Sequence, residues 1–345
     1  MYFERFVGFE SEILWNCTKL RWLCKIVLKL PQQNCKIIAE RICAVCNHGK
    51  EVKQSVAGHV PVSRMTTCVE VDSMKILTLN THSLQEDNYE QKLQWFVAGI
   101  LRELPDVIAM QEVNQSAHAE LMELEELEGQ YPVPGCMAIR KDNHAARVAN
   151  LLRKAGIVCY WAWLPVKRGC DQYDEGVAIV SIGRKIRCVD TFPISKVTDY
   201  CSSRTRAVLG VQLEGMEDWF YSLHMDWWEE EKNGFLEQWK ILNSCVAGKR
   251  MCGSVWLLGD FHAPDHIRGQ SYDHIVSYGW FDTYRLALNK ERGITVPGRA
   301  AENGMRLDYI WCSHKRTVIT SQVVFNGTRE PVVSNHFGVM IEIKE

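Results

Sequence analysis

The chain has 345 residues, of which 46% are hydrophobic and 24% are charged. This composition can bury a large core and excludes an intrinsically disordered protein. The 40 basic and 42 acidic residues give a formal net charge of -2, which leaves no bulk positive field to attract a nucleic-acid backbone.

The first 73 residues differ from the remainder of the chain. They carry six of the 14 cysteines and have ten basic against seven acidic residues. We therefore predict a boundary near residue 73, with an extension of unknown role at 1–73 and the main domain at 74–345. Cys43 and Cys46 form a Cys-x-x-Cys pair without a clear second pair, so zinc binding there is disfavoured.

An apolar segment covers residues 13–30, but four basic residues interrupt it. It also lacks the separate basic and apolar regions of a secretory signal. We therefore expect no membrane span, no membrane partner and a cytoplasmic location.

Strands and helices are predicted in regular exchange from residue 74. The first half contains a strand at 76–79, a helix at 89–104, a strand at 107–110 and a helix at 148–155. The second half adds a helix at 235–246 and strands at 176–182, 207–213, 219–224, 255–258, 307–311, 318–325 and 337–343. So many strands with few long helices predict two packed sheets flanked by helices.

Polar side chains recur where the apolar strands end. They are Asn80, Glu112, His224, Asp260 and His262, with Asp308, Asn335 and His336 beside two later strands. Strand ends are where sites collect in α/β proteins. Acids, amides and histidines together are the side chains that a metal-assisted hydrolase needs.

Five ordered segments carry a family resemblance. They are Leu-Thr-Leu-Asn at 77–80, Met-Gln-Glu-Val-Asn at 110–114, Tyr-Asp-Glu-Gly-Val-Ala-Ile at 173–179, Gly-Asp-Phe-His at 259–262 and Ser-Asn-His-Phe at 334–337. In this order they resemble the endonuclease/exonuclease/phosphatase superfamily over residues 74–345. The resemblance implies a four-layer α/β sandwich of the DNase type. Segments 161–179, 222–228 and 293–298 resemble most the bacterial branch that includes maltose 6'-phosphate phosphatase.

The resemblance also implies roles for the strand-end residues. Mg²⁺, with Mn²⁺ as an alternative, would be bound by Glu112 with Asn80 and Asn335 nearby. Asp260 would position or deprotonate the attacking water, and His224 and His336 would donate to the phosphate. Glu175 would hold the ring of His224 and Asp308 that of His336, while Tyr173 would contact the phosphate. Separately, Trp161 and Trp228 are candidates for stacking on a sugar ring, because apolar sugar faces favour aromatic planes.

Two positions depart from the family pattern. His262 stands where the family has Asn, and Asn335 stands where it has Asp. Asn335 removes a negative charge near the metal, which is expected to weaken Mg²⁺ binding. His262 can donate one ring N–H to a phosphate, but its shape and titration differ from those of an amide.

The sequence therefore predicts a Mg²⁺-dependent phosphatase acting on a small phosphorylated sugar, maltose 6'-phosphate being one candidate, with activity weakened by His262 and Asn335. One alternative is a nuclease or sphingomyelinase-type phosphodiesterase of the same superfamily, although the net charge disfavours a nucleic-acid partner. The other is a non-catalytic relative that binds phosphate esters. The substrate and the oligomeric state stay open at this point.

Overall fold

The computed structural model describes residues 73–228, 234–298 and 304–345. Their strands form a seven-stranded sheet of order β10-β12-β13-β1-β2-β4-β3 and a six-stranded sheet of order β5-β6-β7-β8-β11-β9. The strands are β1 (Ser73–Asn80), β2 (Val107–Ser116), β3 (Cys159–Gly169), β4 (Tyr173–Ile182), β5 (Ile186–Pro193), β6 (Ala207–Leu213), β7 (Trp219–His224), β8 (Val255–Asp260), β9 (Phe281–Asp282), β10 (Asn289–Lys290), β11 (Asp308–Cys312), β12 (Val318–Val324) and β13 (Gly338–Lys344).

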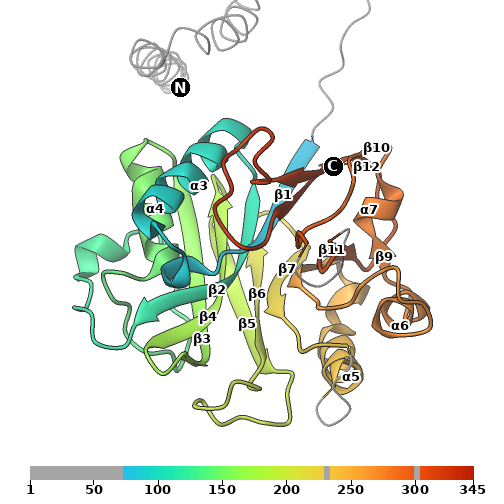
Figure 1. The fold of residues 1–345 in the computed structure, drawn as a ribbon, viewed down its shortest axis with the longest axis horizontal. Helices are drawn as coiled ribbons and strands as arrows, with labels where there is room; N and C mark the ends of the chain where they lie inside the picture. The colour runs from blue at the N-terminus through green and yellow to red at the C-terminus, as the bar shows by residue number, and fades with distance from the viewer. Residues whose placement is uncertain (1–72, 229–233, 299–303) are drawn as a thin grey trace, which may run out of the picture. The chain divides into compact units, whose positions relative to one another are not determined.

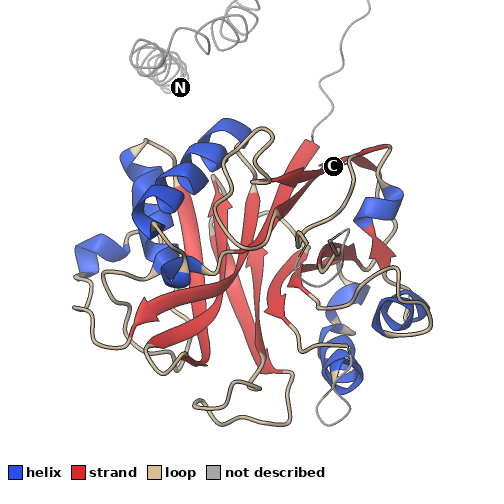
Figure 2. Cartoon of the chain, in the orientation of Figure 1, coloured by secondary structure: helices blue, strands red, loops and turns tan. Residues whose placement is uncertain are grey.

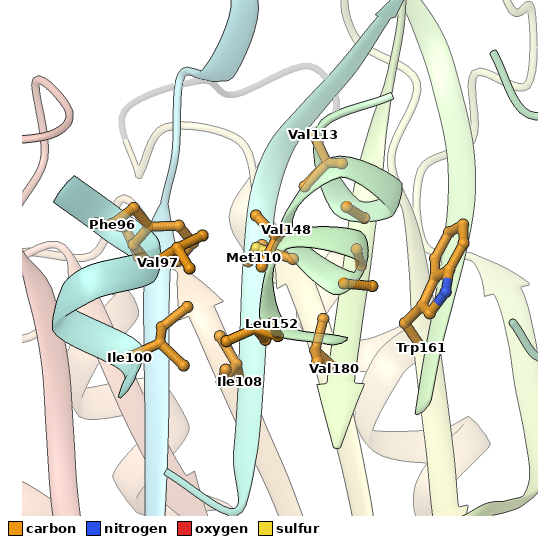
Figure 3. Close-up of a cluster of buried hydrophobic side chains, with 14 of the residues drawn as sticks. Phe96, Val97, Ile100, Ile108, Met110, Val113, Val148, Leu152, Trp161 and Val180 are labelled. Atoms are coloured by element: carbon orange, nitrogen blue, oxygen red, sulfur yellow. The ribbon is translucent and has the colours of Figure 1, made fainter. Parts of the chain in front are cut away.

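Helices cover the outer faces of both sheets (Figure 1). They are α3 (Tyr89–Glu103), α4 (His144–Lys154), α5 (Phe235–Val246), α6 (Ser271–Ser277) and α7 (Thr283–Leu286). The apolar face of α3, with Leu93, Phe96 and Ile100, packs with α4 on the seven-stranded sheet (Figure 3). Helices α5 and α6 bury Trp239 and Ile275 on the six-stranded sheet. The strands thus lie between two helical layers (Figure 2).

A third hydrophobic cluster lies between the sheets. Ile76, Ala109 and Ile179 of one sheet meet Phe220 and Leu258 of the other, and all five side chains are at most 1% exposed. Each sheet therefore buries both faces, one on a helical layer and one on the other sheet. The predicted four-layer α/β sandwich is confirmed.

Two longer strands, β3 and β5, were missing from the sequence prediction. Both lie at sheet edges. The half of β3 that contains Pro165, Lys167 and Arg168 is mostly half-buried. In β5, Arg187 is exposed and Asp190 is half-buried. A strand with one open edge tolerates polar residues and proline, so its apolar pattern is weak.

Residues 1–72 lie outside the described residues, so the boundary near residue 73 stays a prediction. Within the described segments, no helix is both long enough and apolar enough to cross a membrane.

Candidate active site

The topology brings the predicted strand-end residues to one edge of the sandwich. β1 runs parallel to β2, with Asn80 opposite Gln111, and β7 runs parallel to β8, with His224 opposite Asp260. β11 is antiparallel to β8, so its first residue, Asp308, also lies opposite Asp260. Side chains from both sheets therefore converge at the carboxyl ends of the parallel strands.

A carboxylate pair forms the first part of the site. The Asn80 side-chain amide donates to Glu112 Oε1 at 2.9 Å and to Asp260 Oδ2 at 3.2 Å. Glu112 has a left-handed backbone with φ of 51° within a register shift between Met110 and Val113. Such strained bulges persist where the surrounding structure holds them, often to aim a functional side chain. Here the bulge places Glu112 within hydrogen-bonding distance of Asn80.

Gly259, the residue before Asp260, allows the close approach of β7 and β8. Its φ is 150°, and a Cβ atom there would lie 2.0 Å from the carbonyl oxygen of Leu223. Any side chain would therefore separate the two strands that carry His224 and Asp260. This contact explains the glycine of the Gly-Asp-Phe-His segment.

Asp308 and His336 form the second part of the site. His336 Nδ1 donates to Asp308 Oδ2 at 2.9 Å, as the sequence analysis expected. Burial opposes protonation of the ring, but the carboxylates of Asp308 and Asp260 outweigh it and raise the pKa of His336 to about 10. Thr295 Oγ1 accepts from the backbone N–H of Asp308 at 3.2 Å and so fixes the start of β11.

His224 does not have the predicted acidic partner. Glu175 forms an ion pair with Lys167 at 3.1 Å, because the two residues stand opposite each other on β4 and β3. Burial and the nearby charge of Arg206 place the pKa of His224 well below its usual range. The structure therefore corrects the Glu175–His224 pairing, although both residues line one cavity with Lys167 and Arg206.

His262 lies beside Asp260 rather than pointing freely to solvent. Its Nδ1–H donates to the carbonyl oxygen of Met225 at 2.8 Å, and its Nε2 lies 3.3 Å from Asp260 Oδ2. The ring of Trp227 stacks on it, with centroids 4.1 Å apart. Trp228, the sugar-stacking candidate, is half-buried and packs against Trp227 at 5.3 Å. The Trp227–His262 stack was not predicted from the sequence.

The prediction for Trp161 is wrong. Its side chain is fully buried beneath α4 with Val148 and Leu152 (Figure 3), and its Nε1–H donates to the carbonyl oxygen of Glu128. Aromatic content alone did not show which face of β3 the helix covers. A ring packed in this core cannot stack on a sugar.

Tyr173 lies at the start of a strand, and Asn335 lies in the loop before β13. Tyr173 is half-buried at the start of β4. Asn335 is exposed, its Oδ1 lies 3.2 Å from Ser334 Oγ, and its backbone N–H donates to Glu86 at 3.0 Å. These contacts join Asn335 to Ser334 and Glu86 rather than to the carboxylate pair, so they give no support for its predicted role at the metal. Glu86, which sequence reasoning missed, also binds Lys92.

Gln111 connects the two sheets directly behind the site. Its side-chain amide donates to Ser222 Oγ on β7 at 3.0 Å, and its carbonyl accepts from Thr78 on β1 at 3.3 Å. Ser222 in turn donates to the carbonyl oxygen of Met110 at 2.9 Å. The three side chains are fully buried. The bridge therefore fixes β2 against β7 where Glu112 and His224 emerge.

We expect Gln111→Leu to lower the free energy of unfolding by about 2 kcal/mol, because it removes the acceptor of the buried Thr78 hydroxyl and the donor to Ser222 Oγ. Urea denaturation would measure the change. Gln94→Leu, at an exposed position on α3, is the matched control and should change stability by less than about 0.5 kcal/mol. Equal effects of both substitutions would show that the bridge does not hold the sheets together.

The donor set suits a divalent cation. Asp260 is fully buried, and its ion-pair partners within the described segments are the rings of His224, His262 and His336. Buried carboxylates need a charged or hydrogen-bonding partner. Glu112 adds a second carboxylate, which accepts from the same Asn80 side-chain amide as Asp260 does. Carboxylate and amide oxygens are ligands that hard cations prefer.

Comparisons with known proteins agree with this fold. An endonuclease/exonuclease/phosphatase family protein from Leptotrichia buccalis C-1013-b is 30% identical, with a TM-score of 0.69 over 79% of this chain and 100% of that one. The Bacteroides thetaiotaomicron mannosyl-6-phosphatase Bt3783 is 17% identical (TM-score 0.53; 78% and 99% covered). Truncated Caenorhabditis elegans TDP2 is 14% identical (TM-score 0.53; 79% and 98% covered). No protein-family model matches the chain, and no curated protein matches it.

The fold and its strand-end site define the class of protein. The chain belongs to the endonuclease/exonuclease/phosphatase family. Membership of this family supports the interpretation of the chain as a hydrolase.

Proposed function

We propose that the chain is a cytoplasmic Mg²⁺-dependent phosphatase that acts on a small phosphorylated sugar. One observation carries the proposal: Glu112, Asn80 and Asp260 converge with the His336–Asp308 pair at one strand edge. Mn²⁺ is the alternative cation. When bound by Glu112 beside Asn80, the cation would absorb charge that develops on the phosphoryl oxygens.

The protein groups have separate tasks in this proposal. Asp260, a buried carboxylate held by Asn80, accepts a proton from the attacking water or orients it. His336, with its ring fixed by Asp308, donates to a phosphoryl oxygen. His224 and Tyr173 provide further contacts to the phosphate, and Arg206, which lines one cavity with His224, adds a positive charge.

Three observations favour a sugar monoester over nucleic acid. The chain has a net charge of -2, and one structural relative is a mannosyl-6-phosphatase. Trp227 and Trp228 lie beside His262 and offer aromatic surface for a sugar ring. Maltose 6'-phosphate is the first candidate, since the chain resembles the branch of that phosphatase.

A substrate panel tests this proposal. Release of phosphate would be measured from maltose 6'-phosphate, mannose 6-phosphate and a nucleoside monophosphate, with Mg²⁺, with Mn²⁺ and with EDTA. DNA and sphingomyelin cleavage would be followed in parallel. We expect Mg²⁺-dependent release from a sugar phosphate. Preferential cleavage of DNA or sphingomyelin would indicate a phosphodiesterase, and binding without release would indicate a non-catalytic relative.

A further inference from the structure

A second group of ligand atoms lies on the side of Asp260 that faces His224 and His262. Asp260 Oδ2 is 3.8 Å from His224 Nε2 and 3.3 Å from His262 Nε2, and the ligand atoms lie within 4.8 Å of one another. A cation with bonds of about 2.1 Å holds its ligand atoms about 3 to 3.5 Å apart. Small side-chain movements would therefore bring the three atoms to metal-binding distance.

The ring of His262 is already oriented for coordination. Its Nδ1–H donates to the carbonyl oxygen of Met225, which turns Nε2 toward Asp260. Metal-binding histidines are usually held by such a hydrogen bond on the other ring nitrogen. Trp227 stacks on the ring and fixes its plane.

His224 has a ligand atom without a partner, and the carboxylate of Asp260 is held in place. His224 Nε2 is buried and has no hydrogen-bond partner within the described segments. The second oxygen of Asp260, Oδ1, accepts from the backbone N–H of His262 at 3.1 Å, which orients the carboxylate. A buried nitrogen without a partner is costly unless a ligand satisfies it.

We propose that His224, Asp260 and His262 bind a divalent transition metal such as Zn²⁺. Two imidazoles and one carboxylate select this class of cation, whereas Mg²⁺ prefers oxygen ligands. His262 is thus a specialisation that adds a nitrogen ligand where the family has an amide. The inference goes beyond the proposed function, because binding of the metal needs no phosphate ester.

Metal binding by the full chain tests this site. Zn²⁺ affinity would be measured by equilibrium dialysis in excess Mg²⁺, and Co²⁺ would report ligand type through its visible spectrum. All proteins would carry Cys43→Ser and Cys46→Ser, so that the Cys-x-x-Cys pair does not contribute. We expect about one tightly bound Zn²⁺ per chain and a Co²⁺ spectrum without thiolate bands. His262→Asn should weaken Zn²⁺ binding about 100-fold.

His266→Asn is the matched control, because His266 is exposed and near in sequence. It should leave Zn²⁺ affinity unchanged, and thermal unfolding would show that each variant is folded. His224→Gln is the second variant and should lose Zn²⁺ as well. Equal Zn²⁺ affinity in wild type and both site variants would overturn the proposal. So would loss of Zn²⁺ in Glu112→Gln alone, which would place the ion at the oxygen ligands. Neither result depends on whether any sugar phosphate is hydrolysed.

Discussion

Replacing Glu112 by Gln is expected to lower the Mg²⁺-dependent rate by about 10³-fold, because it removes the anionic ligand of the proposed cation. Glu112 offers the carboxylate that shares the Asn80 amide with Asp260, and the bulge in β2 aims it at the site. Gln keeps the shape and removes the charge. The measurement is kcat and the Mg²⁺ concentration for half-maximal rate on the best substrate of the panel.

Glu103→Gln provides the matched control. Glu103 lies at the end of α3, its side chain is 25% exposed against 19% for Glu112, and it pairs with Lys75 and Arg102. Its substitution should leave the rate within about twofold, since surface ion pairs contribute little. Full activity of Glu112→Gln, or of the wild type in EDTA, would contradict the metal assignment.

Asp308→Asn is expected to reduce kcat by about 10³- to 10⁴-fold, since removing the charge of the acidic partner of a catalytic histidine costs about 10⁴-fold in a serine protease. The Asp308 carboxylate accepts from His336 Nδ1 and helps to keep the ring protonated against the effect of burial. An amide provides no negative charge, so the pKa of His336 falls and Nε2 no longer offers a proton to the phosphate. Rates across the pH range would show the loss at neutral pH.

Asp218→Asn is the control for a buried carboxylate. Asp218 accepts from Trp256 Nε1 and from the backbone N–H of Ser254, and it precedes Trp219, at the opposite end of β7 from His224. It should lower stability without a matching loss of kcat. If the two variants lose activity in proportion to stability, Asp308 is a structural residue and its role at His336 is wrong.

The buried strands and the order of the motifs could be predicted from the sequence. Interior strands form apolar runs that no solvent-facing polar residues interrupt. The predicted strand at 219–224 coincides with β7, and that at 255–258 lies within β8. The Asp308–His336 contact was also expected. Edge strand β3 was missing, since Lys167 and Arg168 interrupt its pattern. The interior strands and the helices were therefore enough to predict two packed sheets, and the family resemblance implied the four-layer sandwich.

Contacts set by the tertiary structure were not predictable. The left-handed backbone at Glu112 depends on a bulge that only strand pairing reveals. Glu175 binds Lys167 because the register of β3 places them opposite, and a sequence does not give that register. Trp161 was a candidate for stacking on a sugar because of its residue type, but α4 covers its side chain. In each case the partner lies on a different element from the residue itself.

The bridge formed by Gln111 has a consequence for substrate recognition. Its amide ties β2 to β7, so the hydrogen bond fixes the separation of the two strands that carry Glu112 and His224. A preorganised cleft loses little conformational entropy on binding, so more of the contact energy appears as affinity. For the proposed phosphatase, selectivity would then rest on how well a substrate fits this fixed arrangement, rather than on closure of the protein around it.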